Sequence, residues 1–269
     1  MVLVLAAFRE EVSLFLRRGR FEARQRHGET RAYYARQVGP TASEVAVVVS
    51  GAGVARARAA ADWALREFKP KAVVSIGFGG ACKDGLLAGD IVIGTEVTRL
   101  EGAPFSWDAE AIATPLKPDA ALLATVRKAL ETAGVDFHLG RIITLPSVAK
   151  TSAMKRWLGE ALVAAAVDME SYAVAQASAN AGVPFIAARA VIDVAGAGLP
   201  AFVSTINSSL GVRNAGPALK SILRSPGDIA LLPGLARSFM RARRSVAASL
   251  MATAFELDQS RSSQPAAAA

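Results

Sequence analysis

Short apolar runs alternate along this chain with segments whose apolar residues recur at helical spacing. The runs predict strands and the longer periodic segments predict helices. The predicted strands cover residues 2–7, 33–37, 44–50, 72–76, 90–97, 141–145, 163–167 and 185–191, and the predicted helices cover 10–16, 54–68, 119–133 and 171–181. Strands that alternate with helices favour an α/β fold, with a mostly parallel central sheet and helices on both faces.

The pattern changes in the last quarter of the chain. Apolar residues there keep helical spacing, and arginines occupy another face of the same helix. The apolar positions are Leu235, Phe239, Ala242, Val246 and Leu250, and the arginines are Arg237, Arg241 and Arg244. We therefore divide the chain into a main domain (1–225), a basic amphipathic helical extension (226–258) and a Ser/Gln/Ala-rich tail (259–269) expected to be disordered.

The composition argues against a membrane-spanning protein, a secreted protein and a metal site. No run reaches the roughly 18 apolar residues of a membrane span, and the N-terminus lacks the basic region of a signal peptide. The single cysteine, Cys82, excludes an intramolecular disulfide and suits a reducing compartment. His27 and His138 are far apart and have no neighbouring cysteines, so we expect no metal site. These features predict a cytoplasmic protein.

The net charge of +8 is concentrated near the C-terminus. Residues 212–250 contain seven basic residues and one acid. A basic amphipathic helix either packs on its own domain or a partner with its arginines in water, or lies on an anionic membrane surface. Nucleic-acid binding is not expected, because no aromatic residues are interleaved with the charge.

Two glycine-rich stretches follow predicted strands. Ser50-Gly51-Ala52-Gly53 half-matches a dinucleotide-binding fingerprint, but the next strand ends in Gly77-Phe78-Gly79-Gly80 and offers no acid for a ribose. A tight strand-to-helix turn explains the first stretch. The second lies where open α/β sheets bind ligands, although a simple glycine-rich connection explains it equally well.

Four acids occupy positions that invite a chemical role. Asp168 and Glu170 flank Met169 beside an apolar run, and a buried acid requires a partner or a task. Glu11 begins a helix, where a solvated acid that stabilises the helix dipole is the default interpretation. Asp193 ends an apolar strand before a Gly/Ala-rich loop, which favours a place in a site.

Taken together, four blocks resemble the nucleoside phosphorylase and nucleosidase superfamily, which includes purine nucleoside phosphorylases and methylthioadenosine/S-adenosylhomocysteine nucleosidases. The blocks are Ala7–Val12, Gly77–Val97, Val167–Ser171 and Arg189–Asp193, and the resemblance extends over residues 1–225. It implies a three-layer α/β/α fold with a mixed, mostly parallel sheet, and an enzyme that cleaves N-ribosidic bonds.

The resemblance also implies roles for individual residues. Asp193 matches the acid that protonates purine N7, Glu11 the acid that activates water, and Glu170 the carboxylate that binds the ribose 2′ and 3′ hydroxyls. Asp168 is expected to be a structural acid. The remaining substrate-binding positions are Met169 and Phe8 at the ribose, Phe78, Gly79 and Gly80 in the glycine block, Ser147 and Val148 near the base, and Arg189, which is expected to orient an acidic neighbour.

Departures from the family pattern bear on the substrate. Ser75 and Phe78 replace residues that hold phosphate in phosphorolytic relatives, Ser147 replaces an aromatic residue, and Ile192 replaces a serine. These changes and the basic extension are similar to the hopanoid-associated phosphorylases, which implies release of adenine from adenosylhopane. A methylthioadenosine/S-adenosylhomocysteine or futalosine nucleosidase, and a non-catalytic nucleoside-binding protein, remain alternatives.

The expected partners follow from this resemblance. The substrate would be a lipid-linked adenine nucleoside, the enzyme would contact the inner membrane surface peripherally, and it would form a dimer or larger homo-oligomer. No cofactor is expected. Water and inorganic phosphate both remain possible acceptors, and Arg9 or Arg56 would be available to bind phosphate.

Overall fold

A computed structural model describes residues 1–38, 43–101, 112–198 and 232–260. The strands are β1 (Val2–Ala6), β2 (Glu22–His27), β3 (Thr30–Val38), β4 (Ser43–Val49), β5 (Ala72–Ala81), β6 (Ile91–Arg99), β7 (Phe137–Thr144), β8 (Ala164–Asp168) and β9 (Phe185–Asp193). The helices are α1 (Arg9–Arg18), α2 (Val54–Phe68), α3 (Ala120–Thr132), α4 (Ser152–Leu162), α5 (Ser171–Asn180) and α9 (Leu232–Ser260).

The strands form one mixed sheet in the order β2-β3-β4-β1-β5-β8-β7-β6-β9. The central pairs β1–β4, β1–β5 and β5–β9 are parallel, whereas β5–β8 and β6–β9 are antiparallel. Because β9 pairs with both β5 and β6, the strands β5, β8, β7, β6 and β9 close into a ring. The carboxyl ends of β5, β8 and β9 therefore meet near one point.

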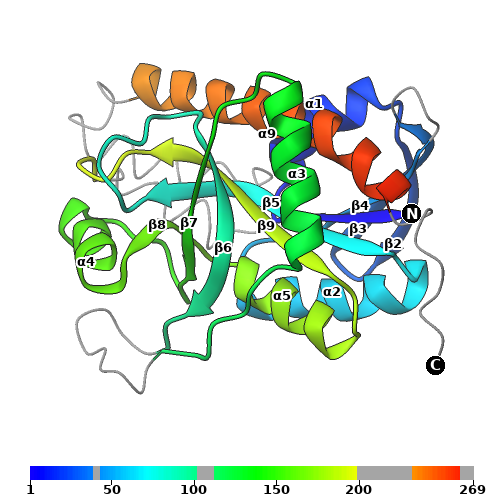
Figure 1. The fold of residues 1–269 in the computed structure, drawn as a ribbon, viewed down its shortest axis with the longest axis horizontal. Coiled ribbons are helices and arrows are strands. Elements are labelled where there is room, and N and C mark those ends of the chain that lie inside the picture. The colour runs from blue at the N-terminus through cyan, green and yellow to red at the C-terminus, as the bar shows by residue number, and fades with distance from the viewer. Residues whose placement is uncertain (39–42, 102–111, 199–231, 261–269) are drawn as a thin grey trace.

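Helices cover the sheet on both faces, which confirms the predicted three-layer α/β fold (Figure 1). Helices α1, α3 and α9 pack with one apolar cluster on one face, and α2 and α5 pack with a second cluster on the other. Helix α2 approaches the sheet closely because its buried positions Ala57, Ala60, Ala61 and Ala64 are small and lie on one helical face.

The glycine block differs from the sequence prediction. Strand β5 was expected to end at Ile76, but it continues through Gly77–Gly80 to Ala81. Pairing with β9 on one side and β8 on the other holds these glycines extended, with Gly79 opposite Val191 and Gly80 opposite Val167. Pairing on both sides has overridden the weak strand preference of glycine.

Two elements were not predicted from the sequence. Strand β2 is largely exposed and polar, so it has no apolar run to mark it. Helix α4 begins after Thr151, whose hydroxyl accepts a hydrogen bond from Met154 N at 3.1 Å. Its buried face contains Lys155, and a lysine among the apolar positions hid the helical pattern.

The basic C-terminal helix packs on its own protein. Helix α9 contacts α1, α3 and β9, and Ala242, Val246 and Leu250 are fully buried there. Arg237, Arg241 and Arg244 are exposed, so the predicted division into an apolar and a basic face is present. The helix reaches Ser260, two residues into the predicted disordered tail, and residues 226–231 and 261–269 lie outside the described residues.

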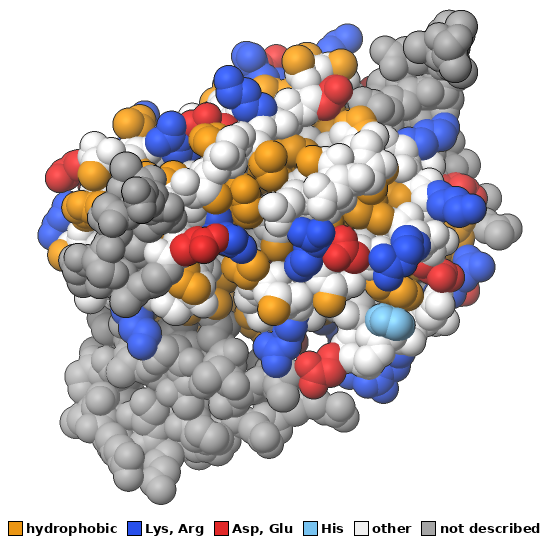
Figure 2. All heavy atoms as spheres, turned by 90° about the horizontal axis from the view of Figure 1, so that it is seen from below, with side chains coloured by type: hydrophobic (Ala, Val, Ile, Leu, Met, Phe, Trp, Pro, Cys, Tyr) orange, Lys and Arg blue, Asp and Glu red, His pale blue; other side chains and the backbone are white. Residues whose placement is uncertain are grey.

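The opposite side of the molecule has a mixed surface. Viewed from the side of α2 and α5, basic side chains are interspersed with acidic ones and with apolar patches (Figure 2). One such pair is Arg58–Asp62 on α2 at 2.8 Å. Within the described ranges, no helix is long and apolar enough to span a membrane.

Candidate active site

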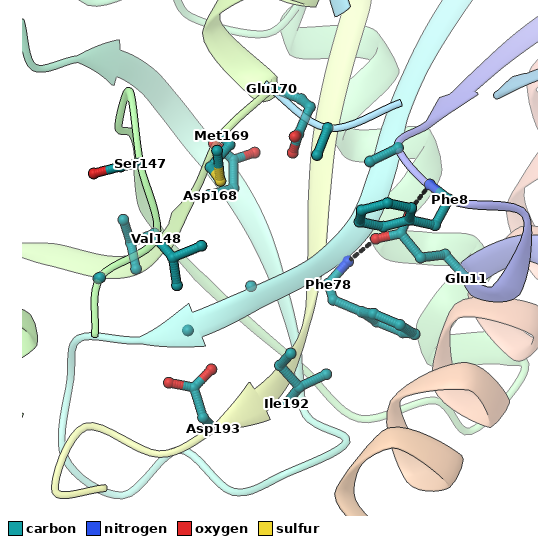
Figure 3. A pocket seen from close by; sticks show the side chains of 16 residues that line it. Phe8, Glu11, Phe78, Ser147, Val148, Asp168, Met169, Glu170, Ile192 and Asp193 are labelled. Carbon is teal, nitrogen blue, oxygen red and sulfur yellow. Dashed lines mark hydrogen bonds between the residues drawn. The ribbon is translucent and has the colours of Figure 1, made fainter. Parts of the chain in front are cut away.

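A pocket lies where the carboxyl ends of β5, β8 and β9 meet the start of α1 (Figure 3). Ten of the eleven residues predicted to form the site line it. They are Phe8, Glu11, Phe78, Gly79, Gly80, Ser147, Val148, Met169, Glu170 and Asp193. This is the position at which α/β sheets of this kind bind ligands.

Glu11 lies on the pocket wall and is 3% exposed, so the solvated-surface interpretation of this acid is wrong. Its Oε2 accepts a hydrogen bond from Phe8 N and its Oε1 accepts one from Phe78 N, both at 2.8 Å (Figure 3). Burial raises the pKa of Glu11, and the two backbone hydrogen bonds oppose this shift. The carboxyl group is therefore held in a fixed orientation by α1 and β5.

Glu170 follows β8 and is held by the turn between β4 and α2. Its Oε1 accepts a hydrogen bond from Gly53 N at 2.7 Å. Gly53 has a φ of 102°, a backbone conformation that favours glycine, and the predicted tight strand-to-helix turn is thereby confirmed. Burial is the main reason that the pKa of Glu170 is raised from 4.5 to about 8, and nearby Asp168 acts in the same direction.

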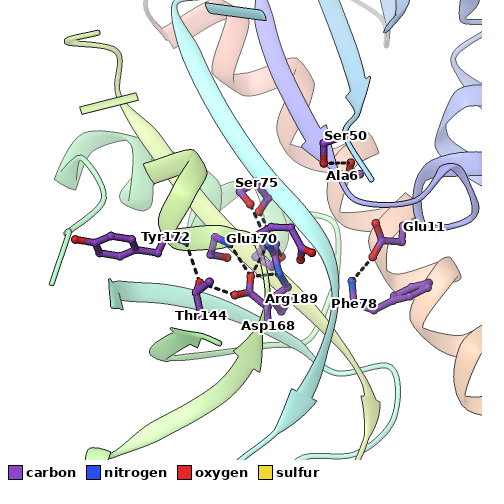
Figure 4. Close-up of polar contacts among 12 residues, drawn as sticks. Ala6, Glu11, Ser50, Ser75, Phe78, Thr144, Asp168, Glu170, Tyr172 and Arg189 are labelled. Atoms are coloured by element: carbon purple, nitrogen blue, oxygen red, sulfur yellow. Dashed lines mark hydrogen bonds and ion pairs between the residues drawn. The ribbon is translucent and has the colours of Figure 1, made fainter. Parts of the chain in front are cut away.

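Asp168 belongs to a buried polar network beneath the pocket (Figure 4). Its Oδ1 accepts from Thr144 Oγ1 at 2.7 Å, and its Oδ2 accepts from Arg189 Nε at 2.6 Å and from Ser171 N at 3.0 Å. Arg189 also donates to the backbone oxygen and the hydroxyl of Ser75, each at 3.0 Å. The network fixes β8 against β5 and β9 directly before Glu170.

This network supports the roles expected of Arg189 and Asp168, but it moves Arg189 out of the set of residues that contact the substrate. Arg189 is 2% exposed and is not among the residues that line the pocket, so its position is behind the site and not on its wall. It orients Asp168, the acidic neighbour, whereas Asp168 both lines the pocket and positions the chain that carries Glu170.

Asp193 ends β9 and faces the pocket across the glycines of β5. It is 8% exposed, and its Oδ2 is 2.5 Å from Nζ of Lys155 on α4. Burial raises the pKa of Asp193, and the Lys155 ammonium opposes the shift. Of the four carboxyl groups that line the pocket, those of Glu11, Glu170 and Asp193 have raised pKa values, as is typical of acid–base sites.

The glycines of β5 make this arrangement possible. A Cβ atom on Gly77 would lie 2.7 Å from Glu11 Oε1, and one on Gly80 would lie 3.3 Å from both oxygens of Asp193. A Cβ on Gly79 would lie 3.0 Å from the backbone oxygen of Val167. The bare strand therefore allows two carboxyl groups to pack directly against its backbone.

The rest of the pocket wall is mainly apolar. Phe8, Met169, Val148 and Ile192 contribute side chains to it. Phe78 also packs edge-on against Phe239 of α9, with ring centroids 5.1 Å apart. The C-terminal helix is therefore in contact with the pocket wall.

Sequence reasoning missed two groups that hold the acids in place. The Gly53 amide was assigned only to a turn, and no local signal connects it with Glu170, which is 117 residues away. Lys155 had a signal: Met154 and Leu158 are apolar at helical spacing around it, which places the lysine on the buried face of a helix. A buried lysine requires an acidic partner.

Comparisons with known proteins identify the family of the chain. A model described as "Phosphorylase superfamily" matches residues 2–225. A 5′-methylthioadenosine/S-adenosylhomocysteine nucleosidase from Exiguobacterium sp. is 31% identical over 159 residues, which are 56% of this chain and 68% of the relative. One from Shewanella piezotolerans is 32% identical over 157 residues, or 56% and 68% of the two chains.

Solved structures share the fold. A 5′-methylthioadenosine/S-adenosylhomocysteine nucleosidase from Neisseria meningitidis, in complex with methylthio-immucillin-A, has a TM-score of 0.71 at 23% identity and covers 96% of this chain and 98% of its own. A futalosine hydrolase mutant from Helicobacter pylori has a TM-score of 0.66 at 17% identity, with 93% and 97% covered. The chain therefore belongs to the phosphorylase superfamily, as its motif blocks predicted, and is an enzyme of the nucleoside hydrolase and phosphorylase type.

Proposed function

We propose that this enzyme hydrolyses the N-ribosidic bond of an adenine nucleoside with an apolar 5′ substituent. The observation that carries the proposal is the meeting of Glu11, Glu170 and Asp193 in one buried pocket. Each of the three carboxyl groups is fixed by a different element, and each matches a different task in cleaving a purine from ribose.

Asp193 acts as the general acid. As the bond between ribose and base breaks, its electron pair moves onto the purine, and a proton delivered to N7 makes the departing base neutral. Burial raises the pKa of Asp193, which favours a carboxyl group that holds a proton near neutral pH.

Glu11 acts as the general base on the attacking water. Each of its carboxyl oxygens accepts one backbone hydrogen bond and retains a lone pair that can take a hydrogen bond from water. The proton of the water passes to Glu11 as the oxygen bonds to the ribose carbon. Burial raises the pKa of Glu11 and so makes its ionised form a stronger base.

Water is the acceptor that the surroundings of the pocket favour. The hydroxyl of Ser75 is bonded to Arg189, and the Phe78 ring packs on Phe239, so neither side chain is arranged to bind phosphate. Arg9 lies over the Tyr33 ring and Arg56 pairs with Glu29, and neither arginine is among the residues that line this pocket.

Glu170 binds the ribose hydroxyls, with Met169 and Phe8 against the sugar. Its Oε1 accepts the Gly53 hydrogen bond, which fixes the carboxyl group for a bidentate contact with a cis-diol. The base lies between Asp193 and the Ser147–Val148 segment, which also lines the pocket.

For the 5′ substituent we propose the hopanoid of adenosylhopane. Two features support this. The pocket wall is mainly apolar, and Phe78 joins it to α9, so a bulky apolar 5′ substituent could pack against both as it leaves the pocket. The 5′-methylthioadenosine/S-adenosylhomocysteine nucleosidase relatives favour a small thioether substituent, and the futalosine hydrolase neighbour offers a third alternative. All three alternatives use the same three acids.

Two associations complete the proposal. Exposed Arg237, Arg241 and Arg244 on α9 make peripheral contact with the anionic inner membrane surface, where a lipid-linked substrate resides. We also propose that the chain forms a homo-oligomer, as the family resemblance implies. Light scattering tests this, and a mass of 28.0 kDa would contradict it.

The deciding experiment supplies adenosylhopane, methylthioadenosine and futalosine separately, with and without phosphate, and follows release of the base. We expect adenine from adenosylhopane at a rate that phosphate does not change. Adenine from methylthioadenosine alone would overturn the hopanoid proposal, and strict phosphate dependence would overturn hydrolysis. Tight adenine binding without turnover of any substrate would identify a nucleoside-binding protein.

A further inference from the structure

A lysine is buried directly behind the proposed general acid. Lys155 is 0% exposed on α4, and its Nζ lies 2.5 Å from Asp193 Oδ2 and 2.6 Å from the backbone oxygen of Val194. The ammonium group is thus held by two acceptors at the carboxyl end of β9. Burying an ammonium group in this way is costly, and its position next to the acid suggests a function beyond packing.

The contact with Lys155 makes it harder for Asp193 to act alone as the general acid. An ammonium group in contact with a carboxyl group favours the ionised carboxylate, which has no proton to give to a departing base. Burial favours the opposite, because in a site of low polarity a neutral acid–amine pair competes with the ion pair. Negative charge that develops next to Asp193 disfavours the carboxylate, and therefore favours transfer of a proton from the ammonium group to the carboxyl group.

We propose that Lys155 is a positioning residue that supplies the proton which Asp193 transfers to the base. As negative charge builds on the purine, the N–H bond of Lys155 breaks and an O–H bond forms at Asp193 Oδ2. That O–H bond then breaks as the N7–H bond forms, and the electron pair of the glycosidic bond remains on the base. Lys155 regains its proton from water after the base leaves. This inference rests on the proposed function.

A titratable thiol lies near the pair, and the carboxyl groups of Glu11, Asp168 and Glu170 line the same pocket as Asp193. Cys82 follows β5, and the charges of Lys155 and Asp193 both act on it. Burial raises the pKa of its thiol to about 12, so it stays neutral over the range of an ordinary pH profile. The exposed residues Arg156 and Glu160 of α4 point away from this buried contact.

The test is the pH dependence of turnover in Lys155→Met, in the full chain, with whichever adenine nucleoside the wild type cleaves. We expect kcat to fall at least about 100-fold with KM within threefold, since general acid catalysis contributes about 100- to 10,000-fold. The alkaline limb of the kcat profile should move to lower pH. A carboxyl group alone loses its proton well below the pH of about 10 at which an ordinary lysine does.

The direction of that shift separates the proposal from its main competitor. If Lys155 only stabilises the Asp193 carboxylate, its removal raises the pKa of Asp193, and activity should extend to higher pH. Such an upward shift, or an unchanged kcat, would overturn the proposal. An N7-methylated nucleoside leaves as a neutral base without a proton, so its cleavage should fall less than threefold in the same variant.

Two further variants keep the test decisive if Lys155→Met folds poorly. Lys155→Arg retains the cation but does not give up a proton, so it should remain folded with kcat reduced at least about tenfold. Wild-type kcat in this variant would show that charge alone matters and would contradict the proposal. Arg156→Met, on the exposed side of α4, is the matched control. A wild type that releases no base would overturn the proposed function and this inference with it.

Discussion

At the scale of single residues, the site requires glycine at positions of β5 where a side chain would occupy the space of a carboxyl group. The carboxyl group of Glu11 occupies the space that a side chain on Gly77 would fill, with Oε1 2.7 Å from the position of a Cβ atom. A methyl group there is compatible with a strand, so the fold should tolerate it. The Glu11 carboxyl group would have to move.

Gly77→Ala is therefore expected to fold and to lose activity. A displacement of about 1 Å at a catalytic group costs about 100-fold in rate, so kcat should fall by about this factor. Steady-state kinetics and thermal unfolding check the two halves of the prediction. Gly196→Ala is the matched control, because among the described residues no atom beyond its own chain neighbours lies within 4 Å of a Cβ there. Normal kcat in Gly77→Ala would remove Glu11 from the mechanism.

Glu170 gives a prediction for stability against pH. Its pKa is raised from 4.5 to about 8, so between these values the folded protein holds a proton that the unfolded chain has lost. The stabilisation is complete below about pH 4.5 and is lost as the pH rises through about 8. The wild-type free energy of unfolding should therefore decrease across this window, and less steeply in Glu170→Gln.

Urea unfolding at several pH values measures that slope. Glu11 and Asp193 also have raised pKa values and act in the same direction, so the decrease in Glu170→Gln is smaller but not absent. Glu160→Gln, at an exposed position of α4, is the control. Identical slopes in the wild type and Glu170→Gln would contradict the raised pKa.

At the scale of elements, α9 is part of the core. Leu250 is fully buried among residues of the sheet and of α1 and α3. Deletion of residues 231–269 is therefore expected to unfold the protein and not only to detach a tail. Arg243 adds a polar anchor, because its Nη2 donates to Ser13 Oγ of α1 at 2.7 Å.

Leu250→Ala should cost about 2–5 kcal/mol in the free energy of unfolding, the usual range for a buried leucine. Met240→Ala is the comparison on the same helix, since Met240 is 40% exposed. It should change stability by less than about 0.5 kcal/mol. Equal small effects in both variants would mean that α9 is not part of the cooperative core.

Most elements were predictable because the spacing of their apolar residues matches the face that each element buries in the structure. The prediction of 54–68 matches α2 at both ends, and Asp119 caps α3 close to its predicted start. The sequence could not show that β5 continues through four residues that include three glycines, because the cause is pairing with strands far along the chain. The burial of Lys155 had a local signal in Met154 and Leu158, but its partner Asp193 is 38 residues away, and no local pattern identifies that contact.

At the scale of the whole molecule, the site combines parts that are remote in sequence. Glu11 comes from the first helix, and Glu170 and Asp193 come from the ends of the two strands that pair with β5 on either side. Phe239 reaches the wall from the C-terminal helix. The family motifs predicted which residues meet. They did not predict that the basic helix would touch the pocket, because no motif includes it.

Membrane binding is testable at this scale with the fold intact. Each exposed cation near an anionic surface contributes about 1 kcal/mol, so Arg237→Gln/Arg241→Gln/Arg244→Gln should bind anionic vesicles at least about tenfold more weakly. Co-sedimentation with vesicles measures this. The control neutralises Arg66, Lys69 and Lys71, which are exposed at and just after the end of α2, the helix that packs with the other apolar cluster from α9. Equal loss in both variants would indicate a general charge effect and not a surface formed by α9.

The closed ring of strands has a consequence for how such an enzyme can change its substrate. Strand β5 pairs on both sides and forms the floor of the pocket, so an altered residue there disturbs the sheet and the acids together. Ser147 and Ile192 line the wall and Phe239 packs against it, and these side chains can be exchanged while the floor stays intact. The strand and acids that carry out catalysis are thus separate from the side chains that contact the rest of the substrate. New specificities should therefore arise by substitutions in the wall alone.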